Sequence, residues 1–449
     1  MRALPSSLVA LAVLLELLFL SLHGLKPLER RVPETIILYL ILSLVHLVAV
    51  WVVLRLPHKP SVFSRLPMVI WFAAVLFRLT VWPLAPVLSD DVYRYRWEGK
   101  LQAHGGNPYQ ARPNDPEWAF LRDETFPSVG SKDFKAGYGP LVQMLQIGMY
   151  RATSVLTADP FVQAFWFKAP YALLDLGVMA ALWALLRRRR LPPERVLIYA
   201  WSPLPVMEFW ATGHNDSAAV LFVLLALLAA SKERWTWSFA ALSLGAAAKF
   251  WPLVLFPAFI GWKGWWPRRW RQWLVLLPIA VLLAWPYRSD VAENIRFMSG
   301  FLGGWRNNDS LHGLLLWMTG DVYRAKYVAF GVVAAAAIVV TLLQWPLEKA
   351  SLALIAIMLI VSSNVHPWYL TWLLPLLAFH PVPALLLWMA LVPLAYHVLI
   401  RWLELGEWQG STPLRWWIYG PVYAMLLLGW LARRQRMMKL WSRLSEIWP

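Results

Sequence analysis

Cysteine is absent from the 449-residue chain. This excludes disulfide bonds, thiolate metal sites and a cysteine nucleophile, but it says little about the compartment in which the protein resides. Charged residues are also scarce, at 15% of the chain, whereas hydrophobic residues make up 59%. Because a soluble domain usually carries about a quarter charged residues, this composition indicates an integral membrane protein.

Several nucleotide-binding and hydrolase motifs are missing as well. The sequence has no GxxxxGK[ST] phosphate loop, no dinucleotide-binding glycine fingerprint, and no GxSxG or HExxH motif. Hydrolysis of a soluble nucleotide is therefore not expected to drive this protein. The net charge of +17 comes from short basic clusters between apolar segments. Such clusters are typical of topology signals beside anionic lipids, so nucleic acid is not an expected partner and membrane lipids are.

Apolar runs of about 20 residues recur along the chain, and each could cross the hydrocarbon core of a bilayer as a helix. We therefore predict an all-α polytopic membrane protein with about 12 to 14 membrane segments. Residues 1–449 are expected to form a single integral membrane domain. Its predicted parts are N-terminal spans (1–87), a long outer loop with an amphipathic helix (88–160), a membrane bundle (161–431) and a cytoplasmic basic tail (432–449).

The basic clusters predict the orientation of these spans, because Lys and Arg favour the cytoplasmic side. The strongest clusters lie at residues 187–190 and 433–443, with a further basic link at 55–65. Both termini are then cytoplasmic, and the polar segment 88–137 faces outward together with the later polar loops. Residues 196–211 are predicted to form one of the spans that return to the outer face.

Residues 235–262 form an apolar segment with basic residues on both flanks. One span cannot place both flanks in the cytoplasm, so we predict a hairpin of two short half-helices with Lys249 and Pro252 near its tip. An ionisable residue inside a membrane usually faces a cavity or a partner. Lys249 could therefore bind the phosphate of a lipid donor, or it could extend to a lipid headgroup.

Residues 89–109, SDDVYRYRWEGKLQAHGGNPY, form a polar stretch directly after an apolar run. Adjacent carboxylates raise each other's proton affinity, which suits Asp90 or Asp91 to general-base catalysis. The pair could instead be a solvated helix cap with Ser89. A cap has no need of Arg94 and Arg96, which could orient the carboxylates or bind a phosphate through bidentate hydrogen bonds.

Other polar residues fall on the same predicted face. His366 precedes a proline at a predicted helix break, where it could contact phosphate or sugar, or simply pack at the interface. His214 and Asp216 could hold a metal, but no other residues have metal-ligand spacing, so a wall of the site is preferred. Asp175 is expected to pair with Lys168 in a structural role. The remaining candidate substrate-binding residues are Glu98, Asn107, Tyr109, Tyr138, Asn308, Trp368 and Tyr369.

Six motifs in order carry a family resemblance: SDDVYRYRWEGKLQAHGGNPY, YGPL, GHNDSAAVLF, AAAKFWPLVLFP, WRNNDSLHGLL and NVHPWYLTWLLPL. Together they resemble bacterial mannosyltransferase-like proteins of the GT-C fold, close to the glycosyltransferase 87 group. The resemblance covers about residues 88–376. It implies a GT-C type helical bundle, a polyprenyl-phosphate sugar donor, inverting transfer and a catalytic aspartate in the first outer loop. The chain departs from the family's common YPPL and WDG at Gly139 and Glu98.

The sequence thus predicts a multi-pass enzyme of the bacterial cytoplasmic membrane with its active site on the outer face. It would move a sugar, with mannose the expected one, from polyprenyl phosphate to a glycan, glycolipid or other acceptor. Asp90 or Asp91 would be the base. No cofactor is expected, and a metal is not required if cations stabilise the departing phosphate. The alternatives are a lipid-linked sugar transporter or flippase, and a polysaccharide ligase with a pyrophosphate-linked donor. The residues expected to bind the donor phosphate are Arg94, Arg96, Lys249 and His366.

Overall fold

A computed structural model describes residues 6–26, 28–56, 66–86, 88–261, 271–288, 306–408 and 410–447. Within these ranges the regular elements are helices, and the only β-type pairing is an isolated bridge between Asn307 and Asn364. The predicted all-α class is confirmed. Most of the basic link at 55–65 and the first part of the second outer loop, 289–305, lie outside the described residues.

Three helices open the bundle: α1 (Ser6–Ser21), α2 (Val32–Arg55) and α3 (Leu66–Val81). α1 packs against both of the others, while side chains such as Leu17, Leu44 and Phe72 remain exposed on the surface of this group. An apolar exposed face of this kind suits contact with lipid chains. Five helical segments of the described chain are long and apolar enough to cross a membrane: 6–25, 32–55, 160–188, 322–342 and 383–405. Four shorter apolar helices accompany them.

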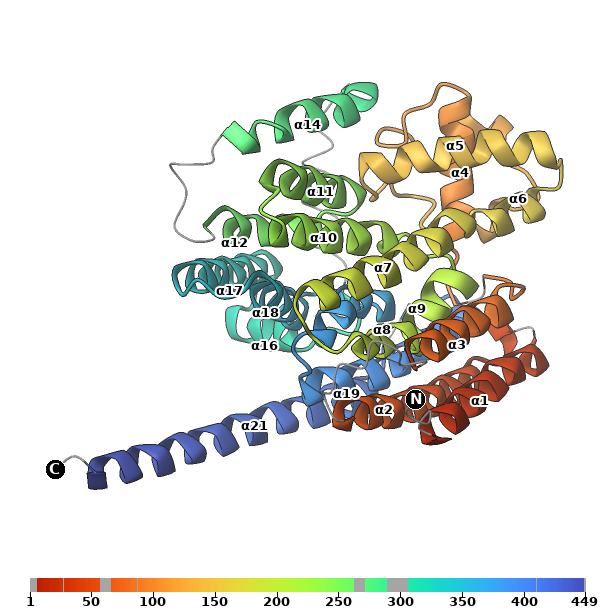
Figure 1. Ribbon diagram of the computed structural model, residues 1–449. Coiled ribbons are helices and arrows are strands. Elements are labelled where there is room, and N and C mark those ends of the chain that lie inside the picture. Colours follow the sequence, from red (N-terminus) through yellow and green to blue (C-terminus); the bar gives the residue numbers. More distant parts are fainter. Residues whose placement is uncertain are drawn as a thin grey trace.

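The predicted outer loop begins with α4 (Asp91–Ala103) and continues through two short 3-10 turns, η3 (Pro116–Leu121) and η4 (Phe126–Ser128). It ends with α5 (Pro140–Leu156), a helix in the part of the loop where the sequence predicts an amphipathic one. Proline at its first position has no N–H to leave unpaired there. α6 (Pro160–Trp166) and α7 (Ala169–Arg188) then lead back into the bundle. Figure 1 shows α4, α5 and α6 gathered at one end of the molecule.

Helical structure is interrupted at two places in the middle of the chain, and both contribute residues to the site. Residues 196–211 are not one continuous span: α8 (Leu197–Ala200) and α9 (Pro203–Pro205) lead into a π-helix, η6 (Val206–Ala211). Two prolines, which lack the N–H that a helix needs, explain the break. The second interruption follows α10 (Asp216–Ser231) and α11 (Trp235–Ala248), where Lys249 adopts an extended backbone before η7 (Trp251–Leu255) and α12 (Phe256–Gly261). The predicted helix break at Lys249 is confirmed.

The remaining helices surround this centre. They are α14 (Leu276–Ala284), α16 (Leu311–Thr319), α17 (Val322–Leu342), α18 (Leu347–Ile360), η10 (Pro367–Trp372), η11 (Leu374–Ala378), α19 (Pro383–Leu391), η12 (Val392–His397), α20 (Val398–Leu405) and α21 (Thr412–Ile447). The short turns η10 and η11 follow the helix break that the sequence predicts at His366. α21 extends beyond the bundle, away from the end that carries α4 and α6 (Figure 1).

A buried ion pair stabilises the centre of the bundle. Asp175 accepts hydrogen bonds from Arg78 Nε at 2.6 Å and from the Tyr199 hydroxyl at 2.5 Å. The predicted partner, Lys168, instead donates to two backbone carbonyls that follow α3. The predicted Asp175–Lys168 pair is therefore wrong. No sequence pattern links Asp175 to Arg78, which is 97 positions away.

Candidate active site

Asp90 and Asp91 stand at the beginning of α4, where Asp90 is the N-cap and Asp91 the first helical residue. The positive end of the helix dipole favours carboxylates at both positions. The backbone N–H of Asp91 donates to Ser89 Oγ at 3.2 Å, so the predicted cap arrangement is partly realised by the serine. The two carboxylates, however, have different surroundings.

Asp91 faces the helical bundle. Its Oδ2 accepts a hydrogen bond from the Tyr95 hydroxyl at 3.1 Å, and His214 Nε2 lies 3.7 Å from the same oxygen. The side chain remains 24% exposed, whereas that of His214 is fully buried. Asp91 is therefore anchored by buried groups on one side while it stays accessible to a small molecule on the other.

Asp90 faces the outer loop instead. Its Oδ2 lies so close to Gly130 that a Cβ built there would be 2.2 Å from it. The residue is exposed overall, but its carboxylate rests against this loop. Burial, and then the charge of Asp91, raises the pKa of Asp90 to about 6. Asp90 thus has the raised proton affinity that the sequence predicts, but its carboxylate is packed against the loop.

A stack of three aromatic rings connects Asp91 to the C-terminal half of the chain. The Trp368 ring lies between two histidine rings, with its centroid 3.9 Å from that of His214 and 4.2 Å from that of His366. Both pairs are close to parallel, at 19° and 8°. Trp368 therefore fixes both imidazoles, and the loop between α18 and η10 becomes part of the site.

His366 is held by a second contact, since Asn307 Nδ2 lies 3.0 Å from its Nδ1. An amide nitrogen can only donate, so Nδ1 accepts and the ring proton sits on Nε2. Burial, followed by the charges of His214 and Lys249, lowers the pKa of His366 to about 3. The ring is then neutral at physiological pH. It can donate a hydrogen bond to a phosphate, but it is not one of the cations that were expected to stabilise the departing phosphate.

Lys249 lies at the end of α11, close to the start of α10. Its Nζ donates to Asp216 Oδ2 at 2.6 Å and lies 3.4 Å from Asn215 Oδ1. Asp216 is fully buried and also accepts from Trp372 Nε1 at 2.6 Å. The ammonium lies 5.1 Å from the Tyr369 ring centroid, and the lysine side chain is 19% exposed. Asp216 thus holds Lys249 in place while part of the lysine remains open to a ligand.

The end of the outer loop docks directly beside this lysine. The Gly139 N–H donates to the Ala248 carbonyl at 3.3 Å, and the Tyr109 hydroxyl donates to the Tyr138 carbonyl at 2.7 Å. Tyr138 packs edge-on against Tyr95, with centroids 5.0 Å apart. Burial, and then the charge of Asp91, raises the pKa of Tyr138 well above its usual value. This contact brings the start of α5 to the break in α11.

Arg94 has partners other than the Asp91 cluster. Its Nε donates to Glu98 Oε1 at 2.7 Å, and its terminal nitrogens donate to the carbonyls of Ser131 and Phe134. Glu98 is fully buried and also accepts from Gln143 Nε2 at 2.7 Å. Burial raises the pKa of Glu98, although Arg94 opposes this rise. These contacts fasten the outer loop to α4 and α5, so both residues have a structural role in this arrangement.

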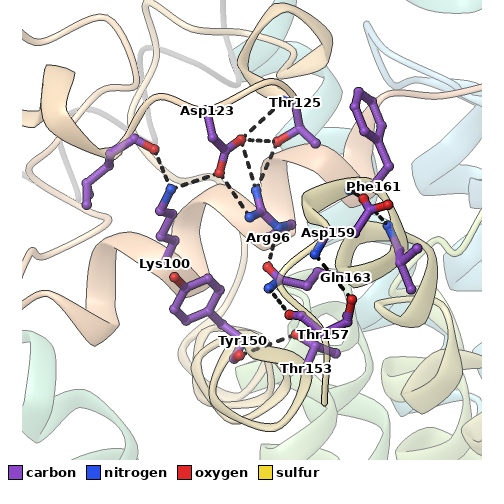
Figure 2. A network of polar contacts seen from close by, with 12 residues as sticks. Arg96, Lys100, Asp123, Thr125, Tyr150, Thr153, Thr157, Asp159, Phe161 and Gln163 are labelled. Carbon is purple, nitrogen blue, oxygen red and sulfur yellow. Dashed lines mark hydrogen bonds and ion pairs between the residues drawn. The ribbon is translucent and has the colours of Figure 1, made fainter. Parts of the chain in front are cut away.

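Arg96 points into another network, which Figure 2 shows. Its guanidinium donates to both carboxylate oxygens of Asp123, at 3.2 and 2.9 Å, and to Gln163 Oε1 at 2.9 Å. Lys100 Nζ donates to Asp123 Oδ2 at 2.8 Å. Burial alone would raise the pKa of Asp123, but the hydrogen bonds from Arg96 and Lys100 hold it well below its usual range. Arg96 therefore joins α4 to the loop and α6, and its donors are occupied by protein groups.

The two predicted asparagines shape loops. Asn107 Oδ1 accepts the Tyr109 N–H at 3.0 Å, which closes a local turn. Asn308, with a positive φ of 51°, donates through Nδ2 to the Val365 carbonyl at 3.2 Å. This contact places the loop next to His366, and it is the neighbouring Asn307 that reaches the histidine ring.

Glu208, which the sequence analysis did not single out, belongs to the cluster. It is fully buried in the π-helix η6, and its Oε2 lies 3.1 Å from His214 Nδ1. The hydroxyls of Tyr39 and Tyr396 donate to it at 3.1 and 2.8 Å. A carboxylate inside the apolar stretch PLPVMEFWA was a signal that could have revealed it, because ionisable groups at membrane depth are commonly functional.

These features define a polytopic helical membrane protein in which carboxylate, histidine and lysine side chains lie around one group of aromatic rings. Residues 6–264 match the MptA_B family, described as alpha-(1->6)-mannopyranosyltransferase, N-terminal domain. The chain belongs to this family, since the match spans more than half of its 449 residues. It is a mannosyl glycosyltransferase of the membrane, and the predicted resemblance to mannosyltransferases is confirmed. No curated protein and no solved structure matches the chain.

Proposed function

We propose that this protein transfers mannose from polyprenyl-phosphate mannose to a hydroxyl of a glycan or glycolipid acceptor, with inversion, at the outer face of a bacterial cytoplasmic membrane. One observation carries the proposal: a continuous series of contacts runs from Asp91 through His214, Trp368 and His366. Lys249 lies beside the same aromatic group, 5.1 Å from the Tyr369 ring centroid. A base and a phosphate-binding cation therefore border one site.

In this mechanism Asp91 removes the proton from the acceptor hydroxyl as its oxygen attacks the anomeric carbon. The bond between that carbon and the phosphate oxygen breaks, and its electron pair leaves with the phosphate. The Lys249 ammonium and the Nε2–H of His366 stabilise the charge that develops there, because preorganised donors act strongly in a poorly solvated pocket. The family name specifies an α linkage, so inversion calls for a β-linked donor.

Asp91 is preferred to Asp90 as the base because of where the two carboxylates lie. Asp91 contacts Tyr95 and the buried His214, whereas the Asp90 carboxylate packs against Gly130 in the outer loop. Arg94 and Arg96, which were expected to bind phosphate, would instead hold the outer loop and α4 in position.

Transfer of radiolabelled mannose from polyprenyl-phosphate mannose by the purified, lipid-reconstituted protein tests the proposal. Asp91→Asn is expected to lower kcat by about 100-fold or more, the usual size of a general-base contribution. Asp90→Asn is the matched control and should retain most of the activity. Equal thermal stability of both variants would show that the fold is intact.

Three results would contradict the proposal. Full activity of Asp91→Asn would remove the base from the mechanism. Movement of an unchanged lipid-linked sugar across sealed vesicles, with no transfer product, would favour a flippase or transporter instead. Transfer from a pyrophosphate-linked donor alone would favour a polysaccharide ligase.

A further inference from the structure

The Asp91–His214 contact continues inward to a third titratable group, Glu208. His214 presents one ring nitrogen to each carboxylate: Nε2 lies 3.7 Å from Asp91 Oδ2, and Nδ1 lies 3.1 Å from Glu208 Oε2. Both His214 and Glu208 are fully buried. Burial of a carboxylate is unfavourable unless it has hydrogen-bond partners. Glu208 therefore requires contacts that offset the free-energy cost of its burial.

Several contacts fix the position of Glu208. The Tyr396 hydroxyl reaches both carboxylate oxygens at 2.8 Å, and the Tyr39 hydroxyl lies 3.1 Å from Oε1. These tyrosines come from η12 and α2, which are distant in sequence from Glu208. The glutamate lies in a π-helix, a geometry that is frequent at functional sites. Its orientation toward His214 is therefore set by three separate elements.

The backbone fixes His214 equally firmly. Its N–H donates to the Glu208 carbonyl at 2.8 Å. Gly213, which precedes it, has a φ of +84°, and a Cβ there would lie 2.7 Å from Lys168 Cγ and 2.8 Å from Val92 Cγ1. On its open face the ring stacks on Trp368. The imidazole is thus confined between the two carboxylates, at 3.7 Å from Asp91 and 3.1 Å from Glu208, although neither ring nitrogen forms a hydrogen bond in this arrangement.

We infer that Glu208 is a positioning residue that keeps the proton of His214 on Nδ1, so that Nε2 is free to accept a proton from Asp91. This inference rests on the proposed function. When the acceptor oxygen bonds to the anomeric carbon, its proton passes to Asp91 and can then pass to His214 Nε2. The phosphate leaves with the electron pair of the broken bond. The resulting imidazolium lies between Glu208 and the regenerated Asp91 carboxylate, which stabilise its charge.

Replacement of Glu208 by glutamine tests this role directly. The amide oxygen can still accept from the tyrosine hydroxyls, but the amide nitrogen donates to His214 Nδ1 and forces the ring proton onto Nε2. Glu208→Gln is therefore expected to lower kcat about 100-fold or more, because a wrong histidine tautomer has a large effect on catalysis. The KM for polyprenyl-phosphate mannose should change little. A merely structural defect would lower stability and would not act on kcat alone.

Glu348→Gln is the matched control. Glu348 is also a buried carboxylate of the bundle, 4% exposed, and it pairs with Arg189. Its replacement should leave kcat unchanged. His214→Gln combined with Glu208→Gln should be no worse than the more damaging single variant, since both changes interrupt one proton path.

The inference is overturned if folded Glu208→Gln keeps the wild-type kcat, or if the losses of the two single variants multiply in the double variant. Failure of the proposed function would look different, because the wild-type protein itself would then not transfer mannose from the polyprenyl-phosphate donor. The two failures are therefore distinguished by the wild-type reaction in the same assay.

Discussion

Lys249 combines two tasks that are usually in conflict. Its ammonium pairs with the fully buried Asp216 at 2.6 Å, which stabilises the fold, and its exposed part is proposed to meet the donor phosphate. A lysine already paired with a carboxylate contributes less net charge to a ligand than a free one. Its value for phosphate binding then lies in a fixed N–H donor rather than in long-range attraction.

Lys249→Met should impair both stability and donor binding. Removal of one partner from a buried ion pair is expected to destabilise the fold by about 3 kcal/mol. Loss of a charged hydrogen bond to phosphate should raise the KM for the donor by about 10-fold or more. Thermal unfolding and transfer kinetics would measure the two effects.

A double variant separates the two tasks of Lys249. The double variant Asp216→Asn/Lys249→Met removes the buried carboxylate together with its cation. Much of the stability that is lost in Lys249→Met should therefore return. The raised KM should persist, because the phosphate still lacks its donor. Recovery of the wild-type KM together with stability would mean that Lys249 is purely structural.

At the scale of elements, the junction between the outer loop and α11 organises the site. Gly139 lies so close to the end of α11 that a Cβ would be 2.1 Å from the Ala247 carbonyl oxygen. Its N–H also donates to the Ala248 carbonyl, a bond that the proline common at this position in similar proteins could not make. The departure from the YPPL pattern therefore has a local structural reason.

Gly139→Ala should separate the outer loop from the break at Lys249. Because backbone atoms cannot move aside easily, the expected destabilisation is about 1 to 3 kcal/mol, with a fall in kcat as Tyr138 and Lys249 shift apart. Gly148→Ala on α5 is the control, since nothing lies within 4 Å of the added Cβ. It should leave activity unchanged. Wild-type activity and stability in Gly139→Ala would show that the close contact is not required.

Features of the fold that depend on a local sequence signal were predictable. Pro140 marked the start of α5, and basic flanks around an apolar segment indicated the break at Lys249. The partners of Arg94 and Arg96 were not predictable, because Ser131 and Asp123 reach them through an irregular loop with no periodic pattern. Glu208 was missed because a single carboxylate in an apolar run does not reveal what it faces.

The two ends of the molecule differ in the elements and charged residues that they carry. One end carries α4 and α6, and the last helix, α21, extends beyond the bundle away from that end (Figure 1). The proposed base, Asp91, is the first residue of α4. Arg187 and Arg188 lie in the last turn of α7, and Arg189 pairs with Glu348 near the start of α18. Because basic clusters favour the cytoplasmic side, we expect this arginine-rich end of α7 to face inward and the site to face outward.

The absence of cysteine makes this orientation directly testable, since any introduced thiol is the only one in the chain. Glu124 in the outer loop and Arg187 at the end of α7 are both exposed. A membrane-impermeant maleimide should label Glu124→Cys in intact spheroplasts, and Arg187→Cys only after permeabilisation. The unmodified chain should give no labelling. The reverse pattern would place the site at the cytoplasmic face, where the acceptor and the sugar donor would have to be cytoplasmic as well.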